Sequence, residues 1–399
     1  MERNVREHRM TRHTCLILIF FVAAVFLTAA AIAAEELEFT FTNSFDGTGQ
    51  QAVAYIPDAC KERENNPLLV IAHYMGGNRF TGKRSGYYPE CDARGYLLVC
   101  PELHGLRTGG QTSLSYLGAQ HDVIDSIEYM KANYSVDTSR IYIVGRSMGG
   151  MLSQVMAAKY PDVFAAAVSG QGISDLPLWY RTSIPNLIKS TVRECGEYSE
   201  ETRFDYERRS SVSFAPNLRY VPLILWHGTN DTWVPPEQSE LIVKEARKYN
   251  RFQPDVHWLH GAAHCPANYS AKWICDQLTY YQNVCEEGHD TPTRFFPDLD
   301  IVTDEAKSFY WLGITQADEG KFARIQANLS GGLLFVRAEN AKEITIDLDK
   351  ISKQTRLSKY DLAADTDMRF KVVRGETTLF EMSAKNTKTG ALPDNLYGR

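Results

Sequence analysis

The sequence lacks an excess of positive charge. Its 399 residues contain 43 Lys and Arg against 49 Asp and Glu, so the formal net charge is −6 at pH 7. Without a basic field of the kind that attracts phosphate backbones, we expect no nucleic-acid partner. With 44% hydrophobic and 23% charged residues, the composition is that of a folded soluble protein, which excludes wholesale disorder, collagen and coiled coil.

Long hydrophobic runs are scarce, and the only one, Cys15–Ala34, lies near the N-terminus behind four arginines. It ends in small residues just before the acidic pair Glu35 and Glu36. This pattern is typical of a secretory signal peptide cleaved after Ala33 or Ala34, so we expect the first 34 residues (1–34) to be removed. The mature chain is then secreted or periplasmic, without stable membrane association. A single uncleaved anchor is the alternative, and a polytopic membrane protein is excluded.

Paired cysteine motifs are absent. Of the eight cysteines, Cys15 precedes the apolar core of the signal peptide, and none of the other seven forms a CxxC pair or stands with histidines at metal-ligand spacing. We therefore expect no metal site and no cofactor. Export to an oxidising compartment predicts disulfides, although an odd number leaves at least one cysteine unpaired within the chain. The seven are Cys60, Cys91, Cys100, Cys195, Cys265, Cys275 and Cys285.

The pattern of apolar runs predicts a three-layer α/β sandwich over residues 35–290. Two alternating runs, Glu38–Thr42 and Gln51–Ile56, indicate an antiparallel hairpin. After them, continuous apolar runs alternate with helix-length segments, which is typical of buried parallel strands covered by helices on both faces. These runs are Leu68–Ala72, Tyr96–Cys100, Ile141–Val144, Ala165–Val168, Pro222–Trp226 and Val256–Leu259, with amphipathic helices expected at Asp122–Ala132 and Pro236–Lys248.

Two regions differ from this alternation. Residues 171–217 form an aromatic-rich stretch after a strand end, which predicts a lid or substrate wall, with an ordinary surface excursion as the alternative. Beyond His289 there is neither His nor Cys. Short β-rich segments separated by turn signals there predict a small β-sandwich domain over residues 295–399.

The motif with the clearest chemistry is the G-x-S-x-G sequence Gly145–Gly149. It follows the predicted strand Ile141–Val144 and precedes a helix-like run, Met151–Lys159. In this strand-turn-helix setting, a serine hydroxyl is exposed on a sharp turn. Phosphate binding is the weaker interpretation, because no Lys-Ser/Thr pair follows and no G-x-G-x-x-G is present. We therefore predict that Ser147 is a nucleophile.

A serine hydroxyl is a weak nucleophile unless a base accepts its proton and an acid orients the base. Asp231 stands just beyond the predicted strand Pro222–Trp226, and His264 follows the last core strand. The order Ser147, Asp231, His264 is the one expected of α/β-hydrolases, so these three residues are the predicted catalytic triad. Weaker candidates, which lack this position after a core strand, are His257 and His260 for the base and Asp175, Asp205 and Asp255 for the acid.

The oxyanion of a tetrahedral intermediate requires two N–H donors. The backbone of Met148, directly after the nucleophile, is the first expected donor. The second should come from the turn after Leu68–Ala72, where His73 and two glycines are typical of an oxyanion loop. Met75 is our first choice for this donor and Tyr74 the second. A plain glycine turn is the alternative.

These motifs resemble those of the α/β-hydrolases of the prolyl-oligopeptidase and esterase type. The resemblance is strongest to secreted esterases similar to polyhydroxybutyrate depolymerases and to feruloyl or acetylxylan esterases. It covers roughly Phe39–Cys285 and rests on Asp122–Gly150, His227–Pro235 and Gly261–His264. It implies an enzyme that cleaves carboxylic esters through an acyl-enzyme intermediate, on a small-molecule, polysaccharide or polyester substrate.

Two residues depart from the family pattern. Tyr74 stands where a glycine often follows the loop histidine, and Arg146 places a positive charge beside the nucleophile, which favours an anionic or polar acyl group. The main alternative function is a serine peptidase, although the roughly 35 residues between the cleavage site and Leu68 leave no room for the propeller typical of prolyl-oligopeptidase-like peptidases. A non-catalytic binding protein on the same scaffold is a third hypothesis. The sequence predicts no oligomeric state.

The predicted domain over residues 295–399 has two candidate roles. It contains no His and no Cys, so we expect it to contribute no catalytic group. Attachment to a polymeric substrate would raise the local concentration of the catalytic domain without taking part in the reaction. Packing against the catalytic domain would instead stabilise it.

Overall fold

The computed structural model describes residues 34–108, 112–249, 254–265, 270–286, 295–353 and 355–397. The predicted signal peptide lies outside these residues apart from Ala34. Of the helices in the described ranges, none is both long enough and apolar enough to cross a membrane.

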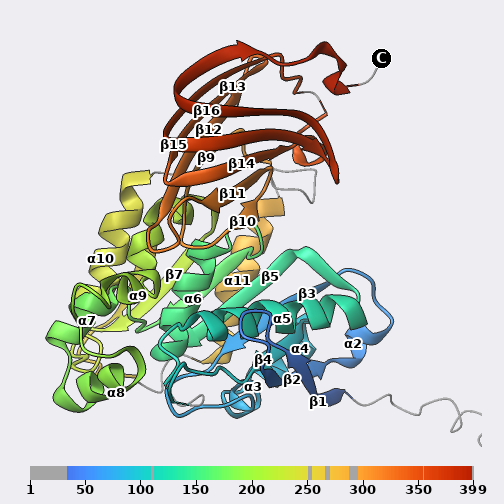
Figure 1. Ribbon diagram of the computed structural model, residues 1–399. Helices are drawn as coiled ribbons and strands as arrows, with labels where there is room; N and C mark the ends of the chain where they lie inside the picture. The colour runs from blue at the N-terminus through green and yellow to red at the C-terminus, as the bar shows by residue number, and fades with distance from the viewer. Residues whose placement is uncertain are drawn as a thin grey trace, which may run out of the picture.

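The first sheet contains eight strands within the described residues (Figure 1). They are β1 (Glu35–Thr42), β2 (Gly49–Ile56), β3 (Asn66–Ala72), β4 (Leu97–Pro101), β5 (Val136–Arg146), β6 (Ala166–Gly170), β7 (Leu223–Gly228) and β8 (Asp255–Leu259). Their order across the sheet is β1-β2-β4-β3-β5-β6-β7-β8. Strand β2 pairs antiparallel with both β1 and β4, and the remaining neighbours are parallel. The predicted hairpin and the mostly parallel sheet are confirmed.

Helices cover both faces of this sheet. They are α2 (Asp58–Lys61), α3 (Thr81–Arg84), α4 (Tyr87–Arg94), α5 (Leu117–Asn133), α6 (Met148–Lys159), α10 (Glu237–Ala246) and α11 (Ala271–Glu286). Alternate residues of β3 enter two separate hydrophobic clusters, because successive side chains of a strand point to opposite faces. Leu68 and Val70 pack with α5 and α6, whereas Leu69 and Ile71 pack with α4 and α11. The three-layer α/β sandwich is thus confirmed.

The stretch 171–217 is helical. It contains α7 (Leu176–Thr182), α8 (Pro185–Cys195), α9 (Arg203–Arg208) and most of the 3-10 segment η1 (Ser211–Tyr220). Its buried side chains form a third hydrophobic cluster with Met148 and Val234, which belong to the first domain. The stretch therefore packs over the turn between β5 and α6 as well as on itself.

The C-terminal strands, orange to red in Figure 1, form a second, mostly antiparallel sheet. They are β9 (Asp298–Thr303), β10 (Lys307–Phe309), β11 (Leu312–Gln316), β12 (Ala323–Ser330), β13 (Leu333–Glu339), β14 (Ala341–Asp347), β15 (Lys359–Arg374) and β16 (Thr377–Ala391). The order is β10-β11-β14-β15-β13-β12-β9, with β16 paired to β15. The predicted boundary between residues 290 and 295 lies outside the described residues.

One hairpin joins the two halves of this second sheet. Strand β16 pairs with β15 along almost its whole length, while β13 and β14 pair in parallel with the first and second halves of β15. The register of β15 and β16 shifts between Ala364 and Met368, where the two halves meet. Strands of 16 and 15 residues are longer than the short segments expected there. The apolar residues Phe370–Val373, near the end of β15, are the part of this strand with the strongest strand signal.

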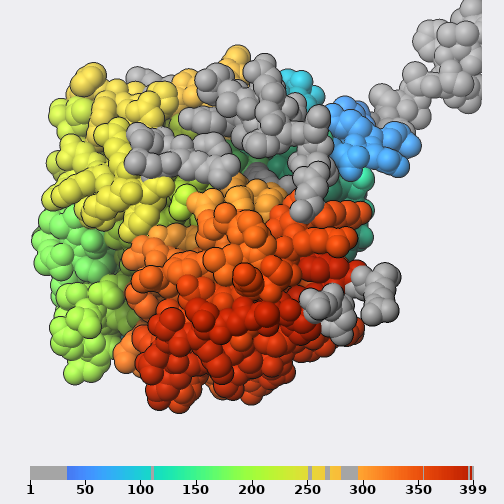
Figure 2. Space-filling model, turned by 90° about the horizontal axis from the view of Figure 1, so that it is seen from above, coloured from blue at the N-terminus to red at the C-terminus, as the bar shows by residue number. Residues whose placement is uncertain are grey.

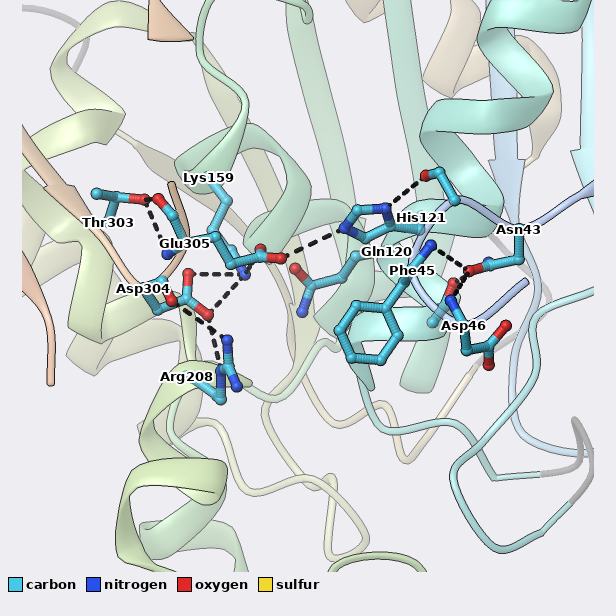
Figure 3. A network of polar contacts seen from close by, with 12 residues as sticks. Asn43, Phe45, Asp46, Gln120, His121, Lys159, Arg208, Thr303, Asp304 and Glu305 are labelled. Carbon is cyan, nitrogen blue, oxygen red and sulfur yellow. Dashed lines mark hydrogen bonds and ion pairs between the residues drawn. The ribbon is translucent and has the colours of Figure 1, made fainter. Parts of the chain in front are cut away.

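Buried ion pairs connect the second sheet to the first domain (Figure 3). Lys159, at the end of α6, is 1% exposed, and its Nζ lies 2.8 Å from Asp304 and 2.9 Å from Glu305. Arg208 of α9 donates to Asp304 over 2.8 Å, and His121 of α5 lies 3.3 Å from Glu305. The turn between β9 and β10 therefore contacts three helices of the first domain. In Figure 2 the orange-to-red C-terminal residues lie directly against the green and yellow residues of the first domain.

No predicted disulfide forms among the six cysteines whose side chains the structure describes, which are free thiols, and the side chain of Cys285 lies outside that part. The six free thiols are Cys60, Cys91, Cys100, Cys195, Cys265 and Cys275, and all except Cys265 are buried. Burial raises the pKa of Cys100, Cys195 and Cys275 to about 12, so these thiols stay protonated. The buried cysteines pack in the hydrophobic clusters as small apolar side chains.

Within the described residues, no group of three or more metal-binding side chains occurs.

Candidate active site

Ser147 occupies a sharp turn between β5 and α6. Its φ of 56° is unusual for a residue other than glycine, and it aims the side chain out of the strand-to-helix turn. The backbones cross so closely here that a Cβ on Gly145 would lie 2.3 Å from the Gly149 carbonyl oxygen. A Cβ on Gly149 would lie 2.1 Å from the carbonyl oxygen of Ala72 in β3. The two motif glycines are therefore a steric requirement of this turn.

His264 links Ser147 to Asp231 through hydrogen bonds. Its Nε2 lies 2.9 Å from Ser147 Oγ, and its Nδ1 lies 2.6 Å from Asp231 Oδ2. Asp231 follows β7 and is 3% exposed, and its Oδ1 accepts the backbone N–H groups of Trp233 and Val234. The carboxylate is thus fixed by its own loop, and the three predicted residues meet although they are far apart in the chain.

The weaker candidates for the base and the acid lie in other environments. Asp175 caps α7 by accepting the N–H of Leu178, and Asp205 pairs with Arg209 over 3.0 Å. Asp255 begins β8, and the ring of His257 packs edge-on against Trp273. None of these four side chains forms a hydrogen bond with Ser147.

The electrostatics of the pair favour an ionised acid and a basic histidine. Burial alone would raise the pKa of Asp231, but hydrogen bonds from His227 and His264 outweigh burial and lower that pKa to about 2. Burial alone would lower the pKa of His264, but its hydrogen bond to Asp231 raises that pKa to about 9. The pair therefore stabilises the imidazolium that would form when His264 accepts a proton.

His73 holds the loop that contains Tyr74 and Met75, the two candidates for the second oxyanion donor. Its Nε2 accepts the backbone N–H of Leu103 over 3.0 Å, so Nδ1 carries the proton and donates to the carbonyl of Tyr74 over 3.0 Å. Burial lowers the pKa of His73, which keeps the ring in this neutral form. Met148 is the first residue of α6, where backbone N–H groups have no acceptor within the helix.

A cavity of about 410 Å³ opens over Ser147 and His264. Apolar side chains dominate its wall: Met75, Ile173, Trp179, Leu187, Trp233 and Val234. The ring of Trp233 is half exposed and its centroid lies 5.2 Å from that of His264. The carbonyl of Trp233 accepts hydrogen bonds from Trp179 and Ser183 of the 171–217 stretch. The 171–217 stretch therefore supplies some of the side chains of the cavity wall and also holds Trp233, another wall residue, in place.

Trp233 and Gln171 belong to the site but were not predicted from the sequence. Trp233 stands two positions after Asp231, so its place in the same loop was the available signal. Gln171 contacts Asp231 and the loop of His264, and nothing in the sequence around it indicates this role.

The strand order and the serine turn define an α/β-hydrolase. A profile of the Prolyl oligopeptidase family matches residues 93–288. Feruloyl esterase B of Talaromyces stipitatus is 27% identical over 296 residues, which cover 69% of this chain and 75% of that protein. Acetylxylan esterase A of Emericella nidulans is 29% identical over 193 residues, or 46% of this chain and 62% of that protein.

Solved structures agree with this fold. A puromycin hydrolase superimposes with a TM-score of 0.53 at 20% identity, covering 63% of this chain and 40% of that one. A puromycin-hydrolyzing peptidase of Mycobacterium tuberculosis gives a TM-score of 0.53 at 22% identity, covering 64% and 40%. The chain thus spans about two fifths of the length of these solved proteins. The chain therefore has the α/β-hydrolase fold, and its feruloyl esterase and acetylxylan esterase relatives support a serine carboxylic ester hydrolase.

Proposed function

We propose that the chain hydrolyses carboxylic esters with Ser147 as nucleophile, His264 as general base and Asp231 as the acid that orients it. The observation that carries this proposal is the continuous hydrogen-bonded chain from Asp231 Oδ2 through His264 to Ser147 Oγ, at the floor of a cavity. In esterases built this way, the carboxylate orients the histidine, the histidine accepts the serine proton, and the serine oxygen attacks the substrate carbonyl.

In the proposed reaction, His264 Nε2 accepts the proton of Ser147 while Oγ bonds to the ester carbonyl carbon. Backbone N–H groups of Met148 and of the loop with Met75 or Tyr74 stabilise the oxyanion. Collapse of the tetrahedral intermediate releases the alcohol, which takes the proton from His264. Water then repeats the sequence on the acyl-enzyme and releases the acid.

The proposed substrates are esters linked to a carbohydrate or polymer, or small fragments of these. Relatives named feruloyl esterase and acetylxylan esterase support this class, and so does a cavity whose wall is mostly apolar and aromatic. We further propose that the chain is exported by its N-terminal segment, with the uncleaved anchor as the alternative.

Hydrolysis by the purified protein should be compared on short p-nitrophenyl esters, methyl ferulate, acetylated xylan, polyhydroxybutyrate and an aminoacyl-anilide. We expect kcat/KM for the best ester to exceed that for the anilide by at least about 100-fold, because the proposed acyl transfer is tuned to an alkoxide leaving group. Faster turnover of the anilide would assign the chain to the peptidases instead.

The same comparison should include a matched anionic and neutral pair, p-nitrophenyl hemisuccinate and p-nitrophenyl butyrate. Arg146 lines the cavity, its guanidinium lies 4.5 Å above the ring of Tyr74, and no carboxylate of the described residues forms an ion pair with it. A charge-assisted hydrogen bond contributes about 1.5–3 kcal/mol, so the kcat/KM ratio of the anionic to the neutral ester should fall about 10- to 100-fold in Arg146→Gln. An unchanged ratio would show that Arg146 does not bind the acyl group of the substrate.

The pH dependence of kcat/KM should reflect the raised pKa of His264. Because only the neutral imidazole can accept the serine proton, kcat/KM should increase with pH from about 6, reach half its maximum near the pKa of about 9 and level off above it. Asp231→Asn should move the midpoint to lower pH, since a neutral amide no longer stabilises the imidazolium. Stability of the fold across the range should be verified by circular dichroism. A flat profile between pH 5 and 8 would argue against a histidine base.

A further inference from the structure

Gln171 is the first residue after β6, and it is fully buried. Its backbone φ of 48° lies in the left-handed region that residues other than glycine seldom adopt. The backbone N–H of Gln171 donates to the carbonyl of Trp226 in β7 over 2.8 Å. Two neighbouring parallel strands therefore fix the point from which the side chain of Gln171 extends.

The side-chain amide of Gln171 contacts both the acid and the histidine loop of the site. Its Nε2 donates to Asp231 Oδ2 over 2.8 Å and to the carbonyl of Ala263 over 3.1 Å. Its Oε1 accepts the backbone N–H of Cys265. Because Ala263 and Cys265 flank His264, one amide group is bonded on both sides of the proposed base and to the carboxylate that orients it.

His264 lies in a loop that has no helix or strand of its own to support it. The next residue, Cys265, also has a positive φ, of 50°. The orientation of the imidazole ring in such a loop depends on contacts with distant parts of the chain. Gln171 supplies two of them, from 92 and 94 residues away.

We propose that Gln171 is a positioning residue that holds the His264 loop in register and shares Asp231 Oδ2 with the histidine. This inference rests on the proposed ester hydrolysis and adds a residue that neither the motifs nor the relatives assign. Asp231 Oδ2 accepts from His264 and Gln171, with His227 Nε2 at 3.5 Å, so these donors divide the charge of one oxygen. Removing the amide leaves more of that charge to the imidazolium, so His264 should hold its proton to a higher pH.

The other titratable or charged groups near the pair are His227, Arg146 and Cys265, and Gln171 forms no hydrogen bond with their side chains. His227 Nε2 lies 3.5 Å from Asp231 Oδ2 and is held by the carbonyl of Val234 over 2.8 Å. Arg146 approaches from the end of β5 across the cavity. Since glutamine is uncharged, replacing it with methionine alters hydrogen bonds without changing the formal charge of the site.

The test is the pH profile of ester hydrolysis by Gln171→Met, measured on the full chain with p-nitrophenyl butyrate. Methionine has a similar length and volume but cannot make the three hydrogen bonds. We expect the midpoint of kcat/KM to rise by about 0.5–1 pH unit and kcat/KM at pH 7 to fall about 10- to 100-fold. KM should change little, because Gln171 does not line the cavity.

Gln154→Met is the matched control. Gln154 of α6 is also fully buried, and its amide bonds Ser169, Ser174 and Ser211, but it contacts no residue of the proposed triad. A purely structural effect of losing a buried amide would lower stability in both variants and leave both pH midpoints at the wild-type value. Gln171→Asn is the second variant, because asparagine tolerates a positive φ while its shorter amide cannot span the three partners.

A midpoint that rises in Gln171→Met or Gln171→Asn but not in Gln154→Met supports the proposal. An unchanged midpoint in a folded Gln171 variant overturns it. Failure of both Gln171 variants to fold while Gln154→Met folds would also overturn it, by assigning Gln171 to stability. The wild type and Gln154→Met test the proposed function separately. If neither hydrolyses esters, the proposed function is wrong; if both do, only the role of Gln171 is being tested.

Discussion

Ser147→Ala should lower kcat for ester hydrolysis by about 10⁴- to 10⁶-fold while the fold stays intact. The hydroxyl is the atom that His264 faces at 2.9 Å, and alanine offers no group that can form the acyl-enzyme. Because alanine is smaller and Ser147 already adopts its φ of 56°, the substitution removes the nucleophile without introducing a clash. Release of p-nitrophenol under saturating substrate measures kcat directly.

Ser153→Ala is the matched control for this experiment. Ser153 lies in the same helix α6, is fully buried, and donates its hydroxyl to the carbonyl of Gly149 over 2.9 Å. It has no contact with His264, so Ser153→Ala should retain activity while losing some stability. Residual activity of Ser147→Ala within tenfold of the wild type, with Ser153→Ala equally active, would contradict the assignment of the nucleophile.

Truncation before Pro297 should unfold the protein and abolish activity on soluble and polymeric esters alike. It removes Asp304 and Glu305, the ion-pair partners of Lys159, and Val302, which bonds Asn217. These buried contacts are lost from a total stability that is usually only about 5–15 kcal/mol. The truncation also exposes Phe214, which packs edge-on against Phe322 at a centroid distance of 5.4 Å.

Thermal unfolding and hydrolysis rates on matched soluble and polymeric esters check this expectation. Asp304→Asn in the full chain should lower the unfolding temperature markedly, because Asp304 is buried and bonds both Lys159 and Arg208. Asp318→Asn is the control, since Asp318 forms an exposed pair with Lys321 and such pairs contribute little. A truncated protein that folds, hydrolyses soluble esters normally and loses activity only on polymer would favour the attachment role.

The sequence was informative where function depends on local backbone geometry. The turn at Ser147 requires glycines two positions before and two positions after the serine, following an apolar strand. Gly145 and Gly149 therefore identify the turn within five residues of sequence. Only part of the long strand β15 is recognisable in the sequence. Asp365 and Asp367, a residue type that strands disfavour, interrupt its alternating pattern, and its pairing depends on β13, β14 and β16.

The fold class and the residues of the proposed triad could be predicted from the sequence, because strand periodicity, the glycines around Ser147, and the places of Asp231 and His264 after apolar strands are each visible in short segments. The free thiols, the lining of the cavity and the contact of the C-terminal sheet with α6 depend on how the elements pack. The bonds of Gln171 to Cys265 and of Lys159 to Asp304 join residues 94 and 145 positions apart. Such contacts leave no local pattern, since they exist only after the strands and helices have packed and buried their polar groups together.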